Sequence, residues 1–326
     1  MANASGDKID LLVYGPVKPV INEGFDAPFQ AHAISSGQDL GRLPPDVTER
    51  IRGIAVTGLV PAGSTVLAKF PKLEIVSSFG VGYDHVDFSY ARDNGIIVTN
   101  TPDVLTEEVA DTAVGLLIAT LREFVNADRY VRTGQWETKD FPLTKGSLRD
   151  RTVGIVGLGR IGKAVARRLD AMLVPVVYHS RRPAEGVAYK HYASLVEMAA
   201  AVDTLVVIIP GGEATRNIIN AEVMKALGPT GVIINVARGS VVDEPALIAA
   251  LKDGTIMAAG LDVFAQEPKV PDALRALHNV TLLPHIGSAS IVTRRAMEQL
   301  VVDNLKAWFA GKAPLTPIPE TPVKGR

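Results

Sequence analysis

Three glycines at a fixed spacing are the residues of this sequence whose chemistry is easiest to define. In the stretch VGIVGLGRIGKAVARRL, Gly157, Gly159 and Gly162 form a GxGxxG motif between a strand pattern and a helix pattern. In such a loop the first glycine permits a tight turn, the second lets the backbone approach a pyrophosphate, and the third lets helix and strand pack closely. A glycine-rich turn that serves only packing is the alternative. The flanking strand and helix, and the second unit of the same kind that follows, favour dinucleotide binding.

The stretch YHSRRP, residues 178–183, indicates which dinucleotide the loop would accept. It ends the next strand pattern, where a carboxylate ordinarily binds the ribose, but Ser180, Arg181 and Arg182 stand there instead. A carboxylate would repel a 2′-phosphate, whereas arginine forms bidentate, charge-assisted bonds with phosphate. The sequence therefore favours NADPH, with NADH as a second option. The alternative is a solvated surface turn in which backbone groups alone hold the ribose of NADH.

Three polar residues that lie close to strand patterns could act on a bound substrate. His285, in LLPHIGS, follows a strand pattern and precedes a helix start, so it could donate a proton. Glu267, in AQEP, could accept a hydrogen bond from the other ring nitrogen and so favour the imidazolium. Arg238, in NVARGSVVD, could grip a carboxylate and a carbonyl oxygen together. Taken singly, a core histidine and a loop glutamate are the more common explanations, and an arginine in a structural ion pair is a serious alternative.

A second glycine-rich turn, FGVGYD, follows a strand pattern in the first third of the chain. The backbone N–H groups of Val81 and Gly82 can face an anionic carboxylate there. A plain tight turn explains the same residues equally well.

The elements that must position these residues are short apolar runs that alternate with helix patterns, which is typical of parallel sheets. A long helix pattern begins near Thr106, and a last one runs from about Ser288 to Ala310, before a proline-rich tail that we expect to be loosely held. The pattern predicts two doubly wound α/β domains. The expected strands are IDLLV, IAVTG, LEIVSS and GIIVTN, followed by RTVGIVG, PVVYHS, VDTLVVIIP, GVIINVA, MAAGLDVF and NVTLLP.

Composition narrows the class of protein. The 326 residues suffice for two domains, and 47% hydrophobic and 21% charged residues with a net charge of −1 argue against nucleic acid as a partner. The run AVGLLIAT at 113–120 is too short to span a bilayer, and the start MANASGDKID does not resemble an export signal, so we expect no membrane association. The chain has no cysteine, which excludes disulfides, thiolate metal sites and a cysteine nucleophile, and which permits the cytoplasmic location that we expect. No metal is expected.

Six blocks of sequence together resemble the D-isomer-specific 2-hydroxyacid dehydrogenase family. They are SSFGVGYDHVD, NTPDVLTEEVADTAVGLL, VGIVGLGRIG, NVARGSVVDEPALIAAL, GLDVFAQEP and LLPHIGSAS. Within the family the chain is most similar to the glyoxylate, hydroxypyruvate and hydroxyphenylpyruvate reductases, whose nucleotide loop carries a similar serine or asparagine followed by arginine. The stretch AMLVPVVYHS departs from the family, which usually has a glycine in the turn before Val174 or Pro175.

The resemblance implies how the domains are arranged. A flavodoxin-like substrate-binding domain would comprise residues 1–101 and 288–326, and a Rossmann-type NAD(P)-binding domain, residues 102–287, would be inserted into it. The active site would lie in the cleft between the two domains.

The resemblance also implies roles for single residues. His285 would be the proton donor, Glu267 its partner and Arg238 the arginine that grips the substrate, while Val81 and Gly82 would bind the substrate carboxylate. The residues that would contact the cofactor are Gly157, Leu158, Gly159, Arg160, Ile161, Gly162, Ser180, Arg181, Arg182, Pro210, Thr215, Val236, Asp262, His285 and Gly287. Among these, Asp262 would bind the nicotinamide carboxamide; judged without the resemblance it is a cap.

Selectivity for the substrate side chain is not settled by the sequence. Leu59 would shape the substrate pocket and Trp136 would reach a neighbouring subunit's site; ordinary apolar packing explains both equally well. The resemblance predicts an NADPH-preferring enzyme that reduces glyoxylate, hydroxypyruvate or a related 2-keto acid such as hydroxyphenylpyruvate to its D-2-hydroxy acid. A homodimer joined through residues 104–145 is expected. The alternative is a dinucleotide-sensing binding protein, like the transcriptional corepressors of this fold, with little turnover.

Overall fold

The chain forms two compact units in the computed structural model, which describes residues 8–149 and 151–323. Unit 1 comprises Met1–Leu105 and Ser290–Arg326, and unit 2 comprises Thr106–Ala289. The chain therefore leaves unit 1 once, builds unit 2 as one continuous insertion, and returns.

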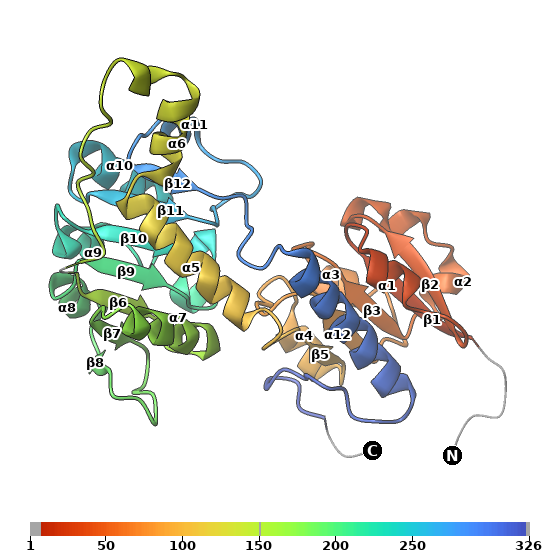
Figure 1. The fold of residues 1–326 in the computed structure, drawn as a ribbon. Coiled ribbons are helices and arrows are strands. Elements are labelled where there is room, and N and C mark those ends of the chain that lie inside the picture. Colours follow the sequence, from red (N-terminus) through yellow and green to blue (C-terminus); the bar gives the residue numbers. More distant parts are fainter. Residues whose placement is uncertain (1–7, 150, 324–326) are drawn as a thin grey trace. The chain divides into compact units, whose positions relative to one another are not determined.

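Unit 1 contains a five-stranded parallel sheet in the order β2-β1-β3-β4-β5, which is the flavodoxin-like order (Figure 1). Its central strands are short runs rich in Val and Ile and are buried on both faces, as parallel sheets covered by helices require. The strands are β1 (Ile9–Tyr14), β2 (Phe29–Ile34), β3 (Gly53–Val56), β4 (Ile75–Ser78) and β5 (Ile97–Thr99).

Helices cover both faces of this sheet. The short helices α2 to α4 share a core with β1, β3, β4 and β5, while α1 and the long α12 pack against each other and α12 packs on β3 and β4. The helices of unit 1 are α1 (Pro19–Glu23), α2 (Pro45–Thr48), α3 (Ser64–Leu67), α4 (Phe88–Asp93) and α12 (Ile291–Phe309), with a 3-10 helix η1 (Gly37–Arg42).

The C-terminal tail is bound to unit 1, and the expectation of a loosely held end was wrong. Ile318 and Thr321 are buried, the N–H of Ile318 donates to the Val98 carbonyl, and the Thr321 hydroxyl accepts from the Val98 N–H at 2.9 Å. The prolines therefore mark an extended segment that pairs with the edge strand β5.

Unit 2 contains a seven-stranded parallel sheet in the order β12-β11-β10-β9-β6-β7-β8. Counted from β6, six of these strands follow the Rossmann order, and β12 extends the sheet beyond them. The strands are β6 (Val153–Val156), β7 (Val176–His179), β8 (Lys190–Tyr192), β9 (Thr204–Val207), β10 (Val232–Asn235), β11 (Ala258–Leu261) and β12 (Val280–Leu282).

Two hydrophobic cores, one on each face of the sheet, hold unit 2 together. One core joins α5 and α7 to the sheet and the other joins α8, α9 and α10 to it (Figure 1). The helices are α5 (Thr106–Leu121), α6 (Phe124–Arg132), α7 (Arg160–Ala171), α8 (Leu195–Ala200), α9 (Ala221–Leu227), α10 (Glu244–Asp253) and α11 (Asp272–Arg275), with 3-10 helices η2 (Gln135–Glu137), η3 (Glu213–Thr215) and η4 (Gly239–Val241).

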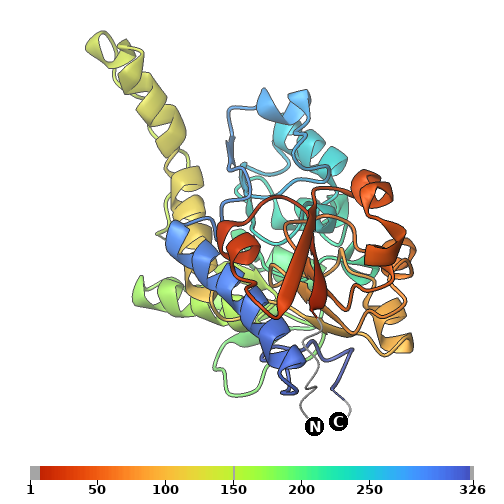
Figure 2. The same ribbon diagram turned by 90° about the vertical axis from the view of Figure 1, so that its right-hand side faces the viewer.

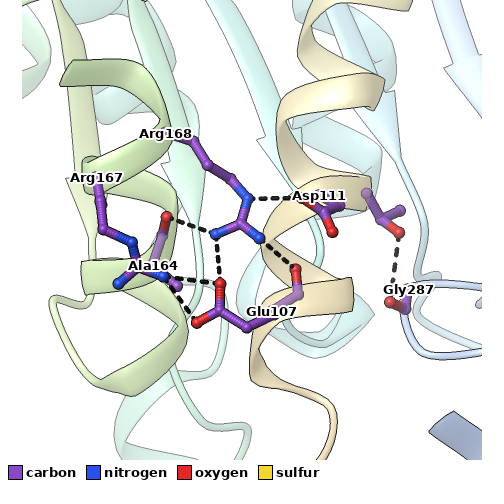
Figure 3. A network of polar contacts seen from close by, with 7 residues as sticks. Glu107, Asp111, Ala164, Arg167, Arg168 and Gly287 are labelled. Carbon is purple, nitrogen blue, oxygen red and sulfur yellow. Dashed lines mark hydrogen bonds and ion pairs between the residues drawn. The ribbon is translucent and has the colours of Figure 1, made fainter. Parts of the chain in front are cut away.

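A network of ion pairs fixes α5 against α7 (Figure 3). Glu107 accepts from Arg167 at 2.7 Å and from Arg168 at 2.8 Å, and Asp111 accepts from Arg168 at 2.7 Å. The hydrogen bonds from the two arginines lower the pKa of Glu107. The pairs are largely solvent-exposed, so they set the register of the two helices more than they stabilise the fold.

The helix expected to begin near Thr106 begins at that residue, and a second helix follows it after a short break. α5 ends at Leu121, Glu123 adopts a left-handed conformation with φ 51°, and α6 starts at Phe124. None of the residues of α6 is buried, and the helix projects from the rest of unit 2 (Figure 2).

Candidate active site

The predicted residues of unit 2 gather at one edge of its sheet. Because all seven strands are parallel, the loops that follow them lie at the same edge. β6 is followed by the glycine loop, β7 by Ser180, β9 by Pro210 and Thr215, β10 by Val236 and Arg238, β11 by Asp262, and β12 by His285 and Gly287.

The glycine loop has the geometry that a pyrophosphate site needs. Gly157 has φ +101°, and a Cβ there would lie 2.6 Å from the Ile208 carbonyl oxygen. At Gly162 a Cβ would lie 2.2 Å from the Gly157 carbonyl oxygen, so α7 can approach the loop only with glycine in its first turn. A Cβ at Gly159, the N-cap of α7, would meet no atom within 4 Å, which leaves open space over the helix N-terminus. These residues fit a dinucleotide phosphate.

The loop after β7 presents cations and no carboxylate. The Ser180 hydroxyl donates to the Arg182 carbonyl at 2.6 Å, and the Ser180 carbonyl oxygen lies 2.9 Å from His191 Nε2. Arg181 and Arg182 are exposed, and within residues 8–149 and 151–323 their side chains make no hydrogen bond or ion pair. Both guanidinium groups are therefore available to an anion, and equally to solvent.

His285 and Glu267 form a hydrogen-bonded pair. Nδ1 of His285 lies 2.7 Å from Oε2 of Glu267, and the other carboxylate oxygen accepts from the Phe264 N–H at 3.0 Å. Burial by itself would raise the pKa of Glu267. The hydrogen bond and charge of His285, the Phe264 N–H and the charge of Arg238 outweigh burial and hold that pKa below its usual value. The carboxylate is thus ionised near neutral pH and leaves Nε2 of His285 free for a reacting atom.

Asp262 fixes the backbone that carries His285. Its carboxylate, 2% exposed, accepts from the Ile286 N–H at 2.7 Å and from the Gly287 N–H at 2.8 Å, and its carbonyl accepts from the His285 N–H. Burial raises its pKa. These bonds hold His285 at φ 56°, an uncommon conformation that turns the imidazole towards Glu267. Asp262 therefore caps this loop, as its local sequence suggested.

Arg238 comes close to Glu267 because of the glycine that follows it. A Cβ at Gly239 would lie 1.9 Å from the Phe264 carbonyl carbon, so the loop after β10 packs directly on the loop that carries Glu267. Asn235 Nδ2 donates to the Arg238 carbonyl at 2.9 Å, and Nη1 of Arg238 donates to the Ala237 carbonyl at 2.8 Å. The half-buried guanidinium contributes to the positive potential that lowers the pKa of Glu267.

Two further cofactor candidates lie in the loops after β9 and β10. The Thr215 hydroxyl donates to the Pro210 carbonyl at 2.7 Å, which closes the loop after β9. Val236 follows β10 and is half-buried. Leu158 is buried under the glycine loop, whereas Arg160 and Ile161 form the first turn of α7.

The candidates of unit 1 also follow its strands. Leu59 lies after β3 and is 46% exposed, and Val81 and Gly82 form the turn after β4. Trp136 lies on η2 beyond α6 in unit 2, is 63% exposed, and is not among the residues at the strand ends.

The described residues contain neither a cluster of metal ligands nor a membrane-spanning helix. No group of three or more histidine, cysteine or acidic side chains in residues 8–149 and 151–323 is placed to hold a metal ion. Within the same residues, no helix combines the length and the apolar character needed to cross a membrane.

Comparison with known proteins shows the family. The family model described as "D-isomer specific 2-hydroxyacid dehydrogenase, NAD binding domain" matches residues 114–287. A glyoxylate/hydroxypyruvate reductase A of Arabidopsis thaliana is 45% identical over 312 residues, which are 96% of this chain and 99% of that protein. The chain belongs to the D-isomer specific 2-hydroxyacid dehydrogenase family. This dehydrogenase is also 50% identical to a hydroxyphenylpyruvate reductase of Plectranthus scutellarioides over 270 residues, covering 83% of this chain and 86% of the relative.

A solved structure matches the dehydrogenase over almost its full length. The crystal structure of an NADPH-dependent glyoxylate/hydroxypyruvate reductase from Sinorhizobium meliloti, in complex with NADP and malonate, has a TM-score of 0.93 and 52% identity. The match covers 98% of this chain and 99% of that one. The dehydrogenase is thus an NAD(P)-dependent oxidoreductase with two parallel-sheet domains, and the corepressor alternative is not favoured.

Reasoning from the sequence missed one residue that contacts a candidate of unit 1. Asn100 Nδ2 donates to the Val81 carbonyl at 2.8 Å and so contacts the second glycine turn directly. Its position after the strand pattern GIIVT was visible, but nothing in the sequence signals that its side chain reaches back to a turn 19 residues earlier.

Proposed function

We propose that this dehydrogenase reduces glyoxylate, hydroxypyruvate or a related 2-keto acid such as hydroxyphenylpyruvate to the D-2-hydroxy acid, with a preference for NADPH. The observation that carries the proposal is the His285–Glu267 pair, 2.7 Å apart, beside Arg238 at the sheet edge that also carries the glycine loop. The relatives named above are reductases of such acids.

The reduction needs a hydride at the carbonyl carbon and a proton at the carbonyl oxygen. When it is bound, the nicotinamide supplies the hydride. His285 gives the proton from Nε2 to the oxygen as that oxygen becomes an alkoxide, and Glu267 keeps the proton on Nδ1 and stabilises the imidazolium before transfer. Arg238 bonds to the carbonyl oxygen and the carboxylate, which polarises the carbonyl and orients the acid.

Unit 1 would bind the acid and unit 2 the dinucleotide. The domain limits expected from the sequence, 101/102 and 287/288, lie within four residues of the limits of the compact units, 105/106 and 289/290. In unit 1 the N–H groups of Val81 and Gly82 would receive the substrate carboxylate, and Leu59 would contact the substrate side chain. In unit 2 the loop Gly157–Gly162 would bind the pyrophosphate, with Pro210, Thr215, Val236, Asp262 and Gly287 along the rest of the cofactor.

The preference for NADPH rests on the charges after β7. Ser180, Arg181 and Arg182 offer a hydroxyl and two exposed guanidinium groups where NADH-specific enzymes carry a carboxylate. A 2′-phosphate forms bidentate bonds with arginine. The relative from Sinorhizobium meliloti is NADPH-dependent and was crystallised with NADP.

We further infer a cytoplasmic homodimer joined through residues 104–145. Several apolar side chains in this region are more than half exposed, namely Phe124, Val125, Val131, Trp136 and Leu143. Apolar exposure of this extent on one projecting segment is typical of an interface. Sedimentation of the purified protein tests the dimer, and cell fractionation tests the compartment.

Steady-state kinetics test the proposed reaction. NADPH and NADH should be compared with glyoxylate, hydroxypyruvate and hydroxyphenylpyruvate, each varied at saturating cofactor. We expect turnover with at least one acid and a higher kcat/KM with NADPH. NADPH binding without turnover on any of the acids would contradict the proposal and restore the sensing-protein alternative.

A further inference from the structure

The peptide bond between Val81 and Gly82 is held by a side chain from another part of the sheet. Asn100, directly after β5, donates from Nδ2 to the Val81 carbonyl oxygen at 2.8 Å. The carbonyl oxygen of Val81 and the N–H of Gly82 belong to the same trans peptide plane and point in opposite directions. A bond that fixes the oxygen therefore also fixes the direction of the Gly82 N–H.

This peptide needs such a bond because its C-terminal residue is glycine. Glycine adopts positive and negative φ at similar cost, so the Val81–Gly82 peptide can flip with little steric penalty. A flipped peptide would present a carbonyl oxygen where the N–H had been. In the part of the chain that the structure describes, neither the Val81 N–H nor the Gly82 N–H donates to a protein acceptor, so both are available to a ligand.

Asn100 is itself fixed by the C-terminal tail. Its N–H donates to the Thr316 carbonyl at 3.2 Å, and the Thr316 hydroxyl donates to the Asn100 carbonyl at 2.6 Å. Thr316 is fixed in turn by the fully buried Asn304 of α12. The Thr316 N–H donates to Asn304 Oδ1 at 3.0 Å, and Asn304 Nδ2 donates to the Thr316 hydroxyl at 2.9 Å. A continuous chain of hydrogen bonds therefore runs from α12 through the tail to the Val81 carbonyl.

The tail also reaches the end of the same turn. The Tyr83 hydroxyl donates to both carboxylate oxygens of Glu320, at 3.0 and 3.2 Å. Desolvation, followed by the hydrogen bond and charge of Glu320, raises the pKa of Tyr83 to about 12, so the hydroxyl stays a donor at neutral pH. On the other side, the Gly80 N–H donates to the Thr101 hydroxyl at 3.0 Å, beside Asn100. The turn is thus tied at Gly80, Val81 and Tyr83.

We propose that Asn100 is a positioning residue that turns the Gly82 N–H towards the substrate carboxylate, and that Thr316 of the tail keeps Asn100 in place. The inference rests on the proposed role of the Val81 and Gly82 N–H groups in carboxylate binding. Asn100 does not touch the acid; it acts through one peptide plane.

The replacement Asn100→Asp tests this directly. A carboxylate at position 100 has no proton to donate and repels the Val81 carbonyl, so it favours the flipped peptide. Because the lost contact is an N–H bond to an anion, KM for glyoxylate and Kd for malonate should rise about tenfold or more. KM for NADPH should stay unchanged, since unit 2 is not altered. Asn100→Ala should raise KM for glyoxylate less, because it removes the bond without adding repulsion.

The matched control is Asn94→Asp in the same unit. Asn94 Nδ2 also donates to a backbone carbonyl, that of Tyr90 at 2.9 Å, but at the exposed end of α4. This variant should keep both constants. Thr316→Val loses the 2.6 Å bond to Asn100 but keeps the side-chain volume. It should raise the KM for glyoxylate and the Kd for malonate less than Asn100→Asp does. If Asn100→Asp does not fold, Thr316→Val tests the proposal in its place.

Malonate binding by calorimetry, in the presence of NADPH, separates this inference from the proposed function because it needs no turnover. If wild type binds malonate but the Asn100 or Thr316 variants bind it equally well, the positioning role is wrong. If wild type neither binds malonate nor reduces any acid, the proposed function fails and the inference fails with it. A crystal structure of Asn100→Asp should show the Val81–Gly82 peptide rotated; an unrotated peptide with unchanged KM would overturn the proposal.

Discussion

Replacing Glu267 by glutamine should move the alkaline limit of keto-acid reduction to lower pH. In the wild type, the ionised carboxylate faces Nδ1 of His285 at 2.7 Å. In the proposed mechanism it stabilises the imidazolium that would donate the proton. The pKa of Glu267 lies below its usual value of 4.5. The stabilisation that this carboxylate provides is therefore fully present above pH 4.5 and is lost only as pH falls through the lowered pKa. Assays at neutral and alkaline pH thus compare an ionised Glu267 with a neutral amide.

The size of the shift follows from the hydrogen bond. A bond to a charged group contributes about 1.5–3 kcal/mol and a neutral one about 0.5–1.5 kcal/mol, and glutamine can still accept through its amide oxygen. The difference is about 1–1.5 kcal/mol, and one pH unit corresponds to about 1.4 kcal/mol. The two side chains are 33% and 23% exposed, so the smaller values apply. We expect the alkaline limit of the reduction to move down by about 0.7 pH unit.

The assay is the pH profile of kcat/KM for glyoxylate with NADPH. At pH values below this alkaline limit the variant and the wild type should react at similar rates, because proton supply to the carbonyl oxygen limits neither enzyme there. Glu244→Gln is the matched control: the Glu244 carboxylate accepts from the Ala265 N–H at 3.2 Å, in the loop that also carries Glu267, and its replacement should leave the profile unchanged. If the alkaline limit of the reduction stays at the same pH in Glu267→Gln, or moves to higher pH, Glu267 does not stabilise the protonated form of His285 as proposed.

Three further variants test other parts of the account. Ser180→Asp combined with Arg181→Ala should move the ratio of kcat/KM values for NADPH and NADH towards NADH, because a carboxylate repels the 2′-phosphate; an unchanged ratio would make the arginines a surface turn. Arg238→Ala should lower kcat for the keto acid about 100-fold or more and raise the KM of that acid. Near-normal kinetics in this variant would show that Arg238 does not bind the carbonyl oxygen and the carboxylate of the substrate. Leu173→Gly should raise the free energy of unfolding by about 0.5–1 kcal/mol, because Leu173 has φ 59°, a left-handed conformation that is unfavourable for leucine. Urea unfolding measures this change in stability. A lower free energy of unfolding in the variant would show that the contacts of the Leu173 side chain stabilise the fold more than its backbone strain destabilises it.

The central strands and the glycine loop were predictable because each is dictated by local residues. Short Val- and Ile-rich runs specify buried parallel strands, and three glycines specify one loop. Two strands were missed, β2 (Phe29–Ile34) and β8 (Lys190–Tyr192). Both are edge strands whose residues are mostly exposed or half-buried, so they lack the apolar run that identifies the others.

Features that depend on distant residues could not be predicted. The tail follows β5 because Ile318 and Thr321 find partners more than 200 positions earlier in the chain. The break between α5 and α6 depends on one left-handed residue, Glu123, inside a run that otherwise favours a helix. The contact of Asn100 with Val81 arises from the pairing of β4 with β5 and has no signature of its own.

The most direct test of the account follows NADPH and hydroxypyruvate together in one reaction with the purified protein. We predict that each NADPH oxidised yields one D-glycerate, and that His285→Ala still binds NADPH but forms almost no product. Bound NADPH with no reduction of hydroxypyruvate by the wild type, formation of L-glycerate, or full activity of His285→Ala would contradict the account.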